Sequence, residues 1–310
     1  MRVAFLGNDA WSVPSLERLA RSRHEMAQVV TRAPRPAGRG RRPRGTPAAE
    51  EAERLGVPLV EVETVKSGPG LEALRAAEPD VLVVVAYGEI LPKEVLDLPR
   101  MAPINVHFSL LPALRGANPV ARAITEGYAV TGVTTMRMDE GMDTGPILLR
   151  RRDHIRSDDD TGTLGTRLAE LGGDLLVETL DRLEAGQLRE RAQSEELASV
   201  APRFTPQEEW IDWTEEADQV WRRVRALAPE PGARTGFRGK TLKVLRATPT
   251  EGAGEAGALI DLSPRGPVVA TGRGAVLLGE VVPEGRRRMP AADWARGARP
   301  DIGERLEGPA

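Results

Sequence analysis

The sequence predicts an α/β protein of two domains: a mostly parallel sheet with helices on both faces, followed by a small barrel of short strands. Three observations support this expectation. The chain has 310 residues, more than a single hydrophobic core usually organises. Its first half alternates apolar strands with helical segments, which is the pattern of a parallel sheet. Its C-terminal third holds short strands separated by Gly and Pro.

The first half predicts a Rossmann-like arrangement with short connections between elements. Strands are expected at residues 2–7, 27–31, 58–62, 80–88 and 104–108, and helices at residues 13–22, 48–56, 70–79 and 93–99. The strand at 80–88, DVLVVVAYG, is apolar without alternation, which indicates burial on both faces. Sheets of this kind bind ligands beyond the carboxyl ends of their strands, where the strand order reverses.

The rest of the first domain is expected to hold two strands and a long helix. Residues 132–152 predict two strands around a loop that contains Asp139, Glu140 and Asp143. Residues 163–187 predict an amphipathic helix, whose apolar stripe consists of Leu164, Leu168, Leu171, Leu175, Val177, Leu180 and Leu183. We therefore expect the first domain to span residues 1–188. The polar segment that follows has no hydrophobic periodicity and is expected to be a linker, residues 189–206.

The second domain, residues 207–310, is expected to consist mainly of strands. One helix is predicted at residues 215–229, followed by strands at residues 241–248, 257–264, 266–272 and 275–283. Short strands at this spacing are typical of a small barrel, and we expect an OB-like barrel of the five-stranded oligonucleotide-binding type.

Composition and missing motifs exclude several classes of protein. Cysteine is absent, which excludes disulfides and thiol nucleophiles, and the three histidines lack metal-ligand spacing, so we expect no metal. The first strand is not followed by G-x-G-x-x-G, so a dinucleotide cofactor is unsupported. Asp143-Thr144-Gly145 is the tripeptide of aspartic proteases, which need two such aspartates that share a proton. The tripeptide occurs once here, in the α/β half of the chain, so the sequence does not support a protease. No apolar run could span a bilayer and the N-terminus lacks a signal pattern, so we expect a cytoplasmic protein without a membrane partner.

An amide and an imidazole lie two positions apart in the stretch INVHFSLLP. Side chains alternate faces along a strand, so Asn105 and His107 share one face while Ile104, Val106 and Phe108 share the other. One interpretation is an edge strand whose polar face meets water. The other is a site at the carboxyl end of a buried strand.

Asp143 extends the second interpretation to a chemistry. An imidazole can take a proton from an attacking amine, and a carboxylate partner can fix its tautomer and raise its basicity. An Asn amide can donate to an oxygen that becomes negative when a carbonyl turns tetrahedral. Together, Asn105, His107 and Asp143 suit acyl transfer to an amine. The alternative for Asp143 is a turn residue, because Asp before Gly commonly serves turns.

Two segments concentrate basic side chains although the net charge is −3. Residues 31–45 hold six arginines and no acid, and their Gly and Pro content predicts a mobile basic loop that seeks phosphates. Residues 222–246 hold eight basic residues against Glu230 alone, which would suit docking on a polyanion. The alternative for residues 31–45 is a solvated loop without a partner. The alternative for residues 222–246 is an ordinary helix and strand whose basic side chains are solvated.

Several blocks resemble a known family. NVHFSLLPALRGANPV resembles the N-x-H-x-S-L-L-P-x-x-R-G signature of folate-dependent formyltransferases, and MDEGMDTGPIL looks like their second block. The Arg-rich loop and the C-terminal barrel are similar to those of family members that act on transfer RNA. The blocks that extend the resemblance along the chain are FLGNDAWSVPSLERL, RPAGRGRRPRG, VVVAYGEILPKEVLDLPR, IDWTEEADQVWRRVRALAPEPGA and PEGRRRMPAADWARG.

The resemblance implies a formyl transfer from 10-formyltetrahydrofolate to the α-amine of initiator methionyl-tRNA. Asn105, His107 and Asp143 match the family's catalytic positions. Its folate site corresponds to Ser109, Leu110, Leu111 and Pro112, which match a tetrahydrofolate-binding turn, and to Tyr87, Gly88, Ile90, Leu91 and Pro92, which match the wall of the pterin pocket. Its tRNA contacts correspond to the loop residues Arg35, Arg39, Arg41, Arg42 and Arg44, and we add the barrel residues Arg222, Arg223, Lys240 and Lys243. A monomer is expected.

Two rival functions stay open at this point. One is another one-carbon enzyme, which formylates an amino sugar or hydrolyses the formyl donor. The other is a protein without catalytic activity that binds RNA through its barrel. The sequence also departs from the family pattern where Asn8-Asp9 follow Gly7, and residues 8–11 are expected near the pocket for the methionine side chain.

Overall fold

The computed structural model describes residues 1–37 and 42–308 and divides the chain into two compact units. The first unit comprises residues 1–119, 130–154 and 165–201, and the second comprises residues 120–129, 155–164 and 202–310. The segment expected to be a linker therefore contributes residues 189–201 to the first unit. None of the described helices is long and apolar enough to cross a lipid bilayer.

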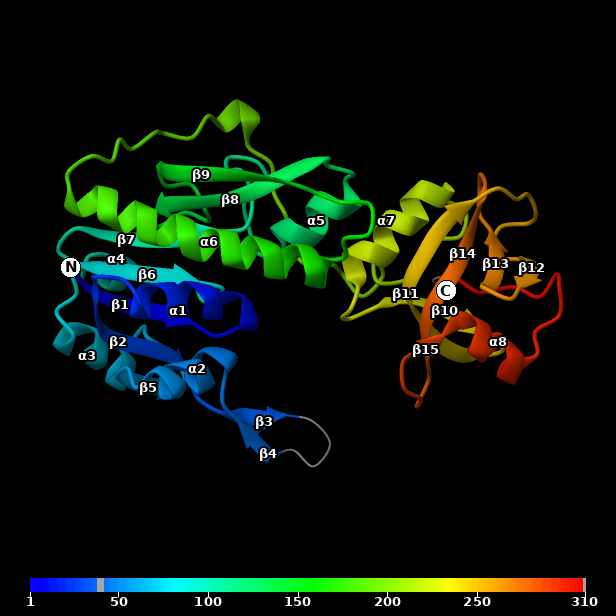
Figure 1. Cartoon of the computed structure of the whole chain (residues 1–310), viewed down its shortest axis with the longest axis horizontal. Coiled ribbons are helices and arrows are strands. Elements are labelled where there is room, and N and C mark those ends of the chain that lie inside the picture. Colours follow the sequence, from blue (N-terminus) through cyan, green and yellow to red (C-terminus); the bar gives the residue numbers. More distant parts are fainter. Residues whose placement is uncertain (38–41, 309–310) are drawn as a thin grey trace. The chain divides into compact units, whose positions relative to one another are not determined.

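The first unit is built on a mostly parallel, seven-stranded sheet, as the alternating pattern predicted (Figure 1). Its order is β5-β2-β1-β6-β7-β8-β9, and only the pairs β7–β8 and β8–β9 are antiparallel. The strand order reverses between β1 and β6. The strands are β1 (Arg2–Gly7), β2 (Glu25–Arg32), β5 (Leu59–Val62), β6 (Val81–Val85), β7 (Ala102–His107), β8 (Val130–Arg137) and β9 (Ile147–His154).

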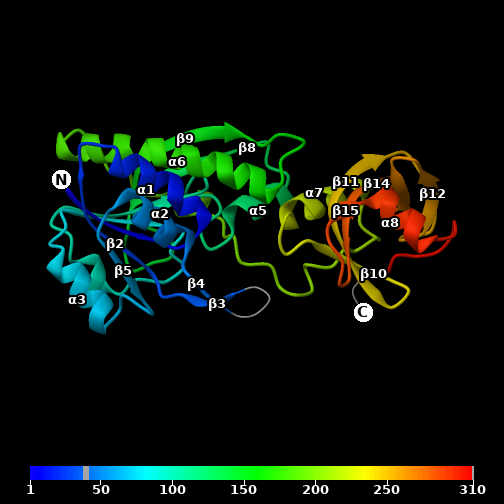
Figure 2. The ribbon, with the colours of Figure 1, turned by 60° about the horizontal axis from the view of Figure 1, so that its bottom comes forward.

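Helices cover both faces of this sheet. On one face, the β1 and β6 side chains Ala4, Leu6, Leu82 and Val84 form a core with residues of α3 (Gly68–Ala76) and α4 (Lys93–Leu96). On the other face, α1 (Val13–Ala20) and α6 (Thr161–Glu184) lie side by side (Figure 2). The remaining helices of the unit are α2 (Pro47–Leu55) and the short η1 (Ala10–Ser12) and η2 (Glu195–Leu197).

Two adjacent glycines allow α6 to approach the sheet and α1 closely. A Cβ on Gly172 would lie 3.0 Å from a methyl of Val106 in β7, and one on Gly173 would lie 2.9 Å from the Pro14 carbonyl oxygen. Close packing of α6 therefore covers the apolar face of β7, opposite the face that carries Asn105 and His107.

The two described ends of the basic segment form strands, where a mobile loop was expected. Arg35–Ala37 (β3) and Arg42–Arg44 (β4) pair as an antiparallel ribbon, with Arg35 opposite Arg44. Pro and Arg tolerate the extended backbone of such a ribbon, so the Gly and Pro content that disfavours a helix does not prevent strand pairing.

The second unit is an antiparallel sheet in the order β10-β11-β14-β13-β12, with β15 paired to β14. β10 and α8 were not predicted from the sequence, because a Gly-containing strand of five residues and a short Ala-rich helix carry little periodic signal. The elements are α5 (Pro119–Thr125), α7 (Ala217–Leu227), β10 (Ala233–Phe237), β11 (Lys240–Thr250), β12 (Leu259–Ser263), β13 (Gly266–Ala270), β14 (Ala275–Pro283), β15 (Met289–Pro290) and α8 (Ala291–Ala298).

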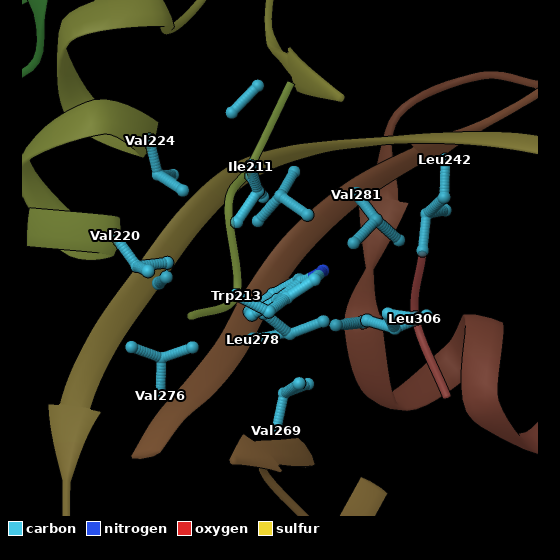
Figure 3. Close-up of a cluster of buried hydrophobic side chains, with 14 of the residues drawn as sticks. Ile211, Trp213, Val220, Val224, Leu242, Val269, Val276, Leu278, Val281 and Leu306 are labelled. Atoms are coloured by element: carbon cyan, nitrogen blue, oxygen red, sulfur yellow. The ribbon is translucent and has the colours of Figure 1, made fainter. Parts of the chain in front are cut away.

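The core of the second unit surrounds Trp213, whose ring lies among side chains from α7 and the strands (Figure 3). Its indole Nε1 donates to Thr235 Oγ1 at 3.0 Å. The C-terminal segment joins the two ends of the sheet, since Gly236 in β10 exchanges backbone hydrogen bonds with Glu307 and Leu259 of β12 donates to the Glu304 carbonyl. This segment gives the open sheet a barrel-like closure.

Candidate active site

The candidate site is built on β7, an interior strand of the sheet. β7 pairs with β6 on one side and β8 on the other, so the edge-strand interpretation of Asn105 and His107 is wrong. Ile104 and Val106 are buried on the opposite face. The two polar side chains therefore face a loop of the protein rather than open water.

That loop joins β8 to β9 and carries Asp143. It starts beside the beginning of β7, where Met138 N–H donates to the Pro103 carbonyl, and it folds over the polar face of the strand. Asp143 Oδ1 accepts from Asn105 Nδ2 at 3.3 Å, and Asp143 Oδ2 lies 3.5 Å from His107 Nδ1. The Gly116 N–H donates to the same Oδ2 at 2.8 Å. The fold thus brings together the amide, the imidazole and the carboxylate that the sequence singled out.

The tautomer of His107 follows from its second ring nitrogen. His107 is 5% exposed, and its Nε2 lies 2.9 Å from the Leu114 carbonyl oxygen. A carbonyl oxygen only accepts, so Nε2 carries a proton in the neutral ring. The lone pair then sits on Nδ1, which faces Asp143. The Leu114 carbonyl is the nearer of the two acceptors and therefore favours the Nε2–H tautomer, while the Asp143 carboxylate lies 3.5 Å from Nδ1.

The turn after β7, Ser109 to Pro112, is held by hydrogen bonds between its backbone and the hydroxyl groups of Thr134 and Ser109. Thr134 Oγ1 in β8 donates to the Ser109 carbonyl at 2.7 Å and accepts from the Leu111 N–H at 3.1 Å. The Ser109 hydroxyl donates to the Ala113 carbonyl, and the side chains of Ser109 and Leu111 are fully buried. Only Leu110 and Pro112 of this predicted folate-binding turn have partly exposed side chains.

The segment after β6, Tyr87 to Pro92, lies partly in the core. Tyr87 and Leu91 are each 3% exposed, whereas Ile90 is 73% exposed. Burial, with a smaller contribution from the charge of Glu89, raises the pKa of the Tyr87 phenol well above its ordinary value. Gly88 has a φ of 82°, a conformation that favours glycine. Ile90 is therefore the side chain of this segment that is presented outward.

Asn8 ties this segment to the neighbouring strands. Its Nδ2 donates to the Tyr87 carbonyl, and its Oδ1 accepts from the Arg32 N–H at 2.7 Å. The residue that departs from the family pattern after Gly7 therefore joins the ends of β1, β2 and β6, at the point where the strand order reverses.

A hollow of about 490 Å³ lies between α4 and the loop that carries Asp143. This volume is within the range of small-ligand pockets, roughly 300–1,000 Å³. None of the predicted folate-binding residues lines it, although α4 follows Pro92 directly. The residues that line it, of which the sequence analysis noted Asp139 and Glu140 but assigned no binding role, are Lys93, Leu96, Asp97, Met138, Asp139, Glu140 and Gly141.

The predicted tRNA-binding arginines of the ribbon are partly paired. Arg35 lies 3.0 Å from Glu63, and Arg44 lies 3.3 Å from Glu50. Glutamates outside the segment therefore balance part of its positive charge. Both pairs are exposed and contribute little to stability. Arg39 and Arg41 lie outside the described residues, and of Arg42 only the backbone, in β4, is described.

The four basic residues predicted in the second unit differ in their surroundings. Arg223 is held inward, because it donates to Glu215 at 2.6 Å and to the Glu208 carbonyl at 3.0 Å. Arg222 and Lys243 are half-buried, and Lys240 is exposed. Lys240 also lines a hollow of about 400 Å³ together with the aromatic side chains of Phe237 and Trp294.

Two further features of the site escaped the sequence analysis. Gln193 Nε2 donates to the Asp143 carbonyl at 2.8 Å, and Arg115 Nε donates to Gln193 Oε1 at 3.0 Å. Gln193 lies in a segment without periodicity and so gave no signal, whereas Arg115 stands inside the signature block. Among the described residues, no group of three or more His, Asp or Glu side chains could hold a metal ion.

Comparisons with known proteins agree with this architecture. Residues 1–180 match the family model described as formyl transferase, and residues 203–299 match that of the formyl transferase C-terminal domain. A methionyl-tRNA formyltransferase of Thermus thermophilus is 47% identical over 306 residues, which cover 99% of each chain. That of Solibacter usitatus is 44% identical over 306 residues, covering 99% of this chain and 98% of the relative.

Solved structures with low sequence identity share the fold. HypX from Aquifex aeolicus in complex with tetrahydrofolic acid has a TM-score of 0.66 at 21% identity, over 98% of this chain and 48% of that chain. Methionyl-tRNA formyltransferase from Clostridium thermocellum has a TM-score of 0.58 at 16% identity, over 81% of this chain and 94% of that chain. With both domain models matched and relatives matched along its whole length, the chain belongs to the formyl transferase family, and within it to the methionyl-tRNA formyltransferases.

Proposed function

We propose that the chain transfers the formyl group of 10-formyltetrahydrofolate to the α-amino group of initiator methionyl-tRNA. One observation carries the proposal: the Asp143 carboxylate lies within 3.5 Å of both the Asn105 amide and the His107 imidazole, in a chain that is 47% identical, over 99% of its length, to a methionyl-tRNA formyltransferase. No Ser or Cys nucleophile is required, because the amine attacks the formyl carbon directly.

Asn105 stabilises the negative charge that forms on the formyl oxygen. Its amide nitrogen has two N–H groups, and one of them is directed to Asp143 Oδ1. This bond orients the side chain, and the second N–H is left to donate to the oxyanion. A donor held in place before the reaction stabilises the transition state without reorganisation.

His107 moves the proton that the attacking amine must lose. Its Nδ1 accepts the proton from the amine nitrogen and returns it to the folate nitrogen that leaves, so no proton is gained or lost overall. The Asp143 carboxylate, 3.5 Å from Nδ1, stabilises the imidazolium between these two steps. The proton on Nε2 stays directed to the Leu114 carbonyl throughout.

The hollow between α4 and the 138–146 loop suits the pterin ring of the folate. Leu96 and Met138 offer apolar contacts to a flat ring, and the Asp139 and Glu140 carboxylates can accept from its amino and ring N–H groups. On the two segments assigned to folate binding, Ile90 is exposed, and Leu110 and Pro112 are partly exposed. Tetrahydrofolate bound to HypX, which shares the fold, is consistent with this assignment.

Transfer RNA is proposed to contact both units through basic side chains. In the first unit these are the ribbon arginines, Arg35, Arg39, Arg41, Arg42 and Arg44, and in the second unit Lys240, Lys243 and Arg222. We further propose that the first unit is the catalytic domain and that the second unit is an OB-like tRNA-binding domain. The protein is proposed to act as a cytoplasmic monomer.

A formylation assay tests the proposed function. The purified chain, 10-formyltetrahydrofolate and charged initiator methionyl-tRNA should yield formylmethionyl-tRNA, and elongator methionyl-tRNA in a parallel reaction should react poorly. A nucleotide-linked amino sugar and the donor alone serve as rival substrates. Formylation of the sugar, donor hydrolysis without an acceptor, or RNA binding without any transfer would overturn the proposal.

A further inference from the structure

Residues 189–201, which we call the strap, run along the catalytic loops of the first unit. Arg191 exchanges both backbone hydrogen bonds with Ile147 at the start of β9, at 2.8 and 2.9 Å. Further along, Arg115 donates its N–H to the Ser199 carbonyl at 2.8 Å, and the Ala201 N–H donates to the Arg115 carbonyl. The strap therefore touches the start of β9, directly after the 138–146 loop, and the turn that ends in Arg115 and Gly116.

Gln193 lies near the middle of the strap and bonds directly to the backbone of the catalytic loop. Its Nε2 donates to the Asp143 carbonyl at 2.8 Å and to the Gly145 carbonyl at 2.7 Å. Both N–H groups of the side-chain amide are therefore used. These bonds leave the Asp143 carboxylate free to face Asn105 and His107.

Arg115 fixes the direction of the Gln193 amide. Its Nε donates to Gln193 Oε1 at 3.0 Å, which turns Nε2 toward the carbonyls of the catalytic loop. The other guanidinium nitrogens bond to both carboxylate oxygens of Glu195 at 3.0 and 2.9 Å. Arg115 is 6% exposed, and the next residue, Gly116, donates to Asp143 Oδ2. The strap therefore holds the backbone of Asp143, and the turn holds its carboxylate.

Asp143 needs such support because its backbone conformation is unfavourable. Its φ is 57°, in the left-handed region that non-glycine residues rarely occupy. Glycine would relieve the strain but would remove the carboxylate. Gln193 holds the backbone of Asp143, while Gly116 and Asn105 hold its side chain.

We propose that Gln193 is a positioning residue for formyl transfer, which acts on the reaction only through Asp143. The inference rests on the proposed function of this site and adds a residue to it. Gln193 is not expected to touch either substrate, so its loss should lower kcat and leave both KM values unchanged. The strap also continues into residue 202 of the second unit, so the chain that supplies this support leads directly into the unit proposed to bind tRNA.

The first experiment compares Gln193→Ala with the wild-type chain in the formylation assay. Displacement of a catalytic group by about 1 Å costs up to about 100-fold, so we expect kcat to fall by about 10- to 100-fold. Gln193→Glu keeps the size but cannot donate to two carbonyls, so it should lose as much. Glu196→Ala, an exposed change on the same strap, should retain wild-type kinetics. Wild-type kcat in Gln193→Ala would overturn the proposal.

A second experiment separates positioning from a general structural role. Single-turnover rates are measured for wild type, Gln193→Ala, Asp143→Ala and the double variant. If Gln193 acts through Asp143, its removal costs nothing further in the Asp143→Ala background. An equal fold loss in both backgrounds would show that Gln193 acts elsewhere and would refute the proposal.

Folding is checked by thermal unfolding of each variant. If Gln193→Ala does not fold, Gln193→Met fills the same space without polar atoms and enters the same cycle. Failure of the proposed function is seen separately, because the wild-type chain and Glu196→Ala would then not formylate methionyl-tRNA at all.

Discussion

At the scale of single residues, His107 has two polar partners. The sequence suggested that a single carboxylate both fixes the tautomer of the imidazole and raises its basicity. The nearer acceptor, the Leu114 carbonyl, favours the Nε2–H tautomer of His107, and Asp143 faces the nitrogen that takes the proton in the proposed mechanism. Asp143 also accepts a hydrogen bond from Asn105, so in the proposed mechanism one side chain supports both the proton carrier and the oxyanion donor.

Replacement of the oxyanion donor should affect the chemical step alone. Asn105→Ala should lower kcat by about 10²–10³, equivalent to about 3–4 kcal/mol, because one positioned donor is lost in the transition state. Steady-state kinetics with methionyl-tRNA measure the loss, and tRNA affinity should stay unchanged. Gln187→Ala, an exposed change outside the site, is the control. A fully active Asn105→Ala enzyme would rule out this role.

At the scale of elements, close backbone packing places β7, β8 and β9 in register beside the site. Gly132 in β8 lies opposite Arg152, and a Cβ on it would come within 2.1 Å of the Arg151 carbonyl oxygen. Because that atom belongs to the backbone of β9, the contact cannot be relieved by a side-chain rotation. The glycine is therefore required by the pairing of the two strands that flank the catalytic loop.

Gly132→Ala should destabilise the first unit by about 1–3 kcal/mol, the usual cost of overpacking a dense region. Gly45→Ala is the matched control in the same unit. Apart from its chain neighbours, no atom would lie closer than 3.7 Å to the new Cβ, so stability should change by less than about 0.5 kcal/mol. Urea unfolding followed by far-UV circular dichroism measures both. Equal stability of the two variants would contradict the packing argument.

At the scale of the whole molecule, charged side chains join segments that are distant in the sequence. In the second unit, Arg122 of α5 lies 2.7 Å from Glu208 and 4.2 Å from the centre of the Phe204 ring. The hydrogen bond from Arg122 lowers the pKa of the Glu208 carboxyl to about 2, from its ordinary 4.5. This pair ties residues 120–129 to the rest of the unit.

Stability of the second unit should therefore decrease in acid. A carboxyl with a lowered folded-state pKa stabilises the fold above its unfolded pKa, and this contribution is lost as the pH falls from about 4.5 to about 2. Glu208→Gln should be less stable than the wild type at pH 6, and the difference should shrink toward pH 2. Four of the five tryptophans, Trp210, Trp213, Trp221 and Trp294, lie in the second unit, so their fluorescence can follow its unfolding. A difference independent of pH would exclude this explanation.

The ribbon should make tRNA binding sensitive to salt. Arg35 and Arg44 can exchange their exposed glutamates for phosphates, so the double variant Arg35→Ala/Arg44→Ala should bind tRNA more weakly at unchanged kcat. The slope of log affinity against log salt should become shallower by about 0.9 for each phosphate that the variant no longer neutralises. Arg75→Ala, an exposed arginine of α3 paired with Glu94, should leave the slope unchanged. A slope that persists in the double variant would exclude phosphate binding by these arginines.

Elements whose side chains repeat with a period could be predicted from the sequence. Alternating and continuous apolar runs predicted the strands β1, β6 and β7, and the Leu stripe predicted α6, because burial on one face leaves a regular mark on the sequence. The N-x-H pattern also placed Asn105 and His107 on one face of a strand. The relation to formyl transferases was visible in contiguous blocks.

The support that irregular segments give to the site became visible only in the folded chain. The strap, the left-handed backbone of Asp143 and the bond between His107 and the Leu114 carbonyl all depend on hydrogen bonds between segments distant in the sequence or without regular structure. Such bonds impose no period on the chain, because each depends on one donor and one acceptor that meet only after the sheet has formed. For this reason Gln193 looked like a linker residue in the sequence and lies beside the catalytic loop in the fold.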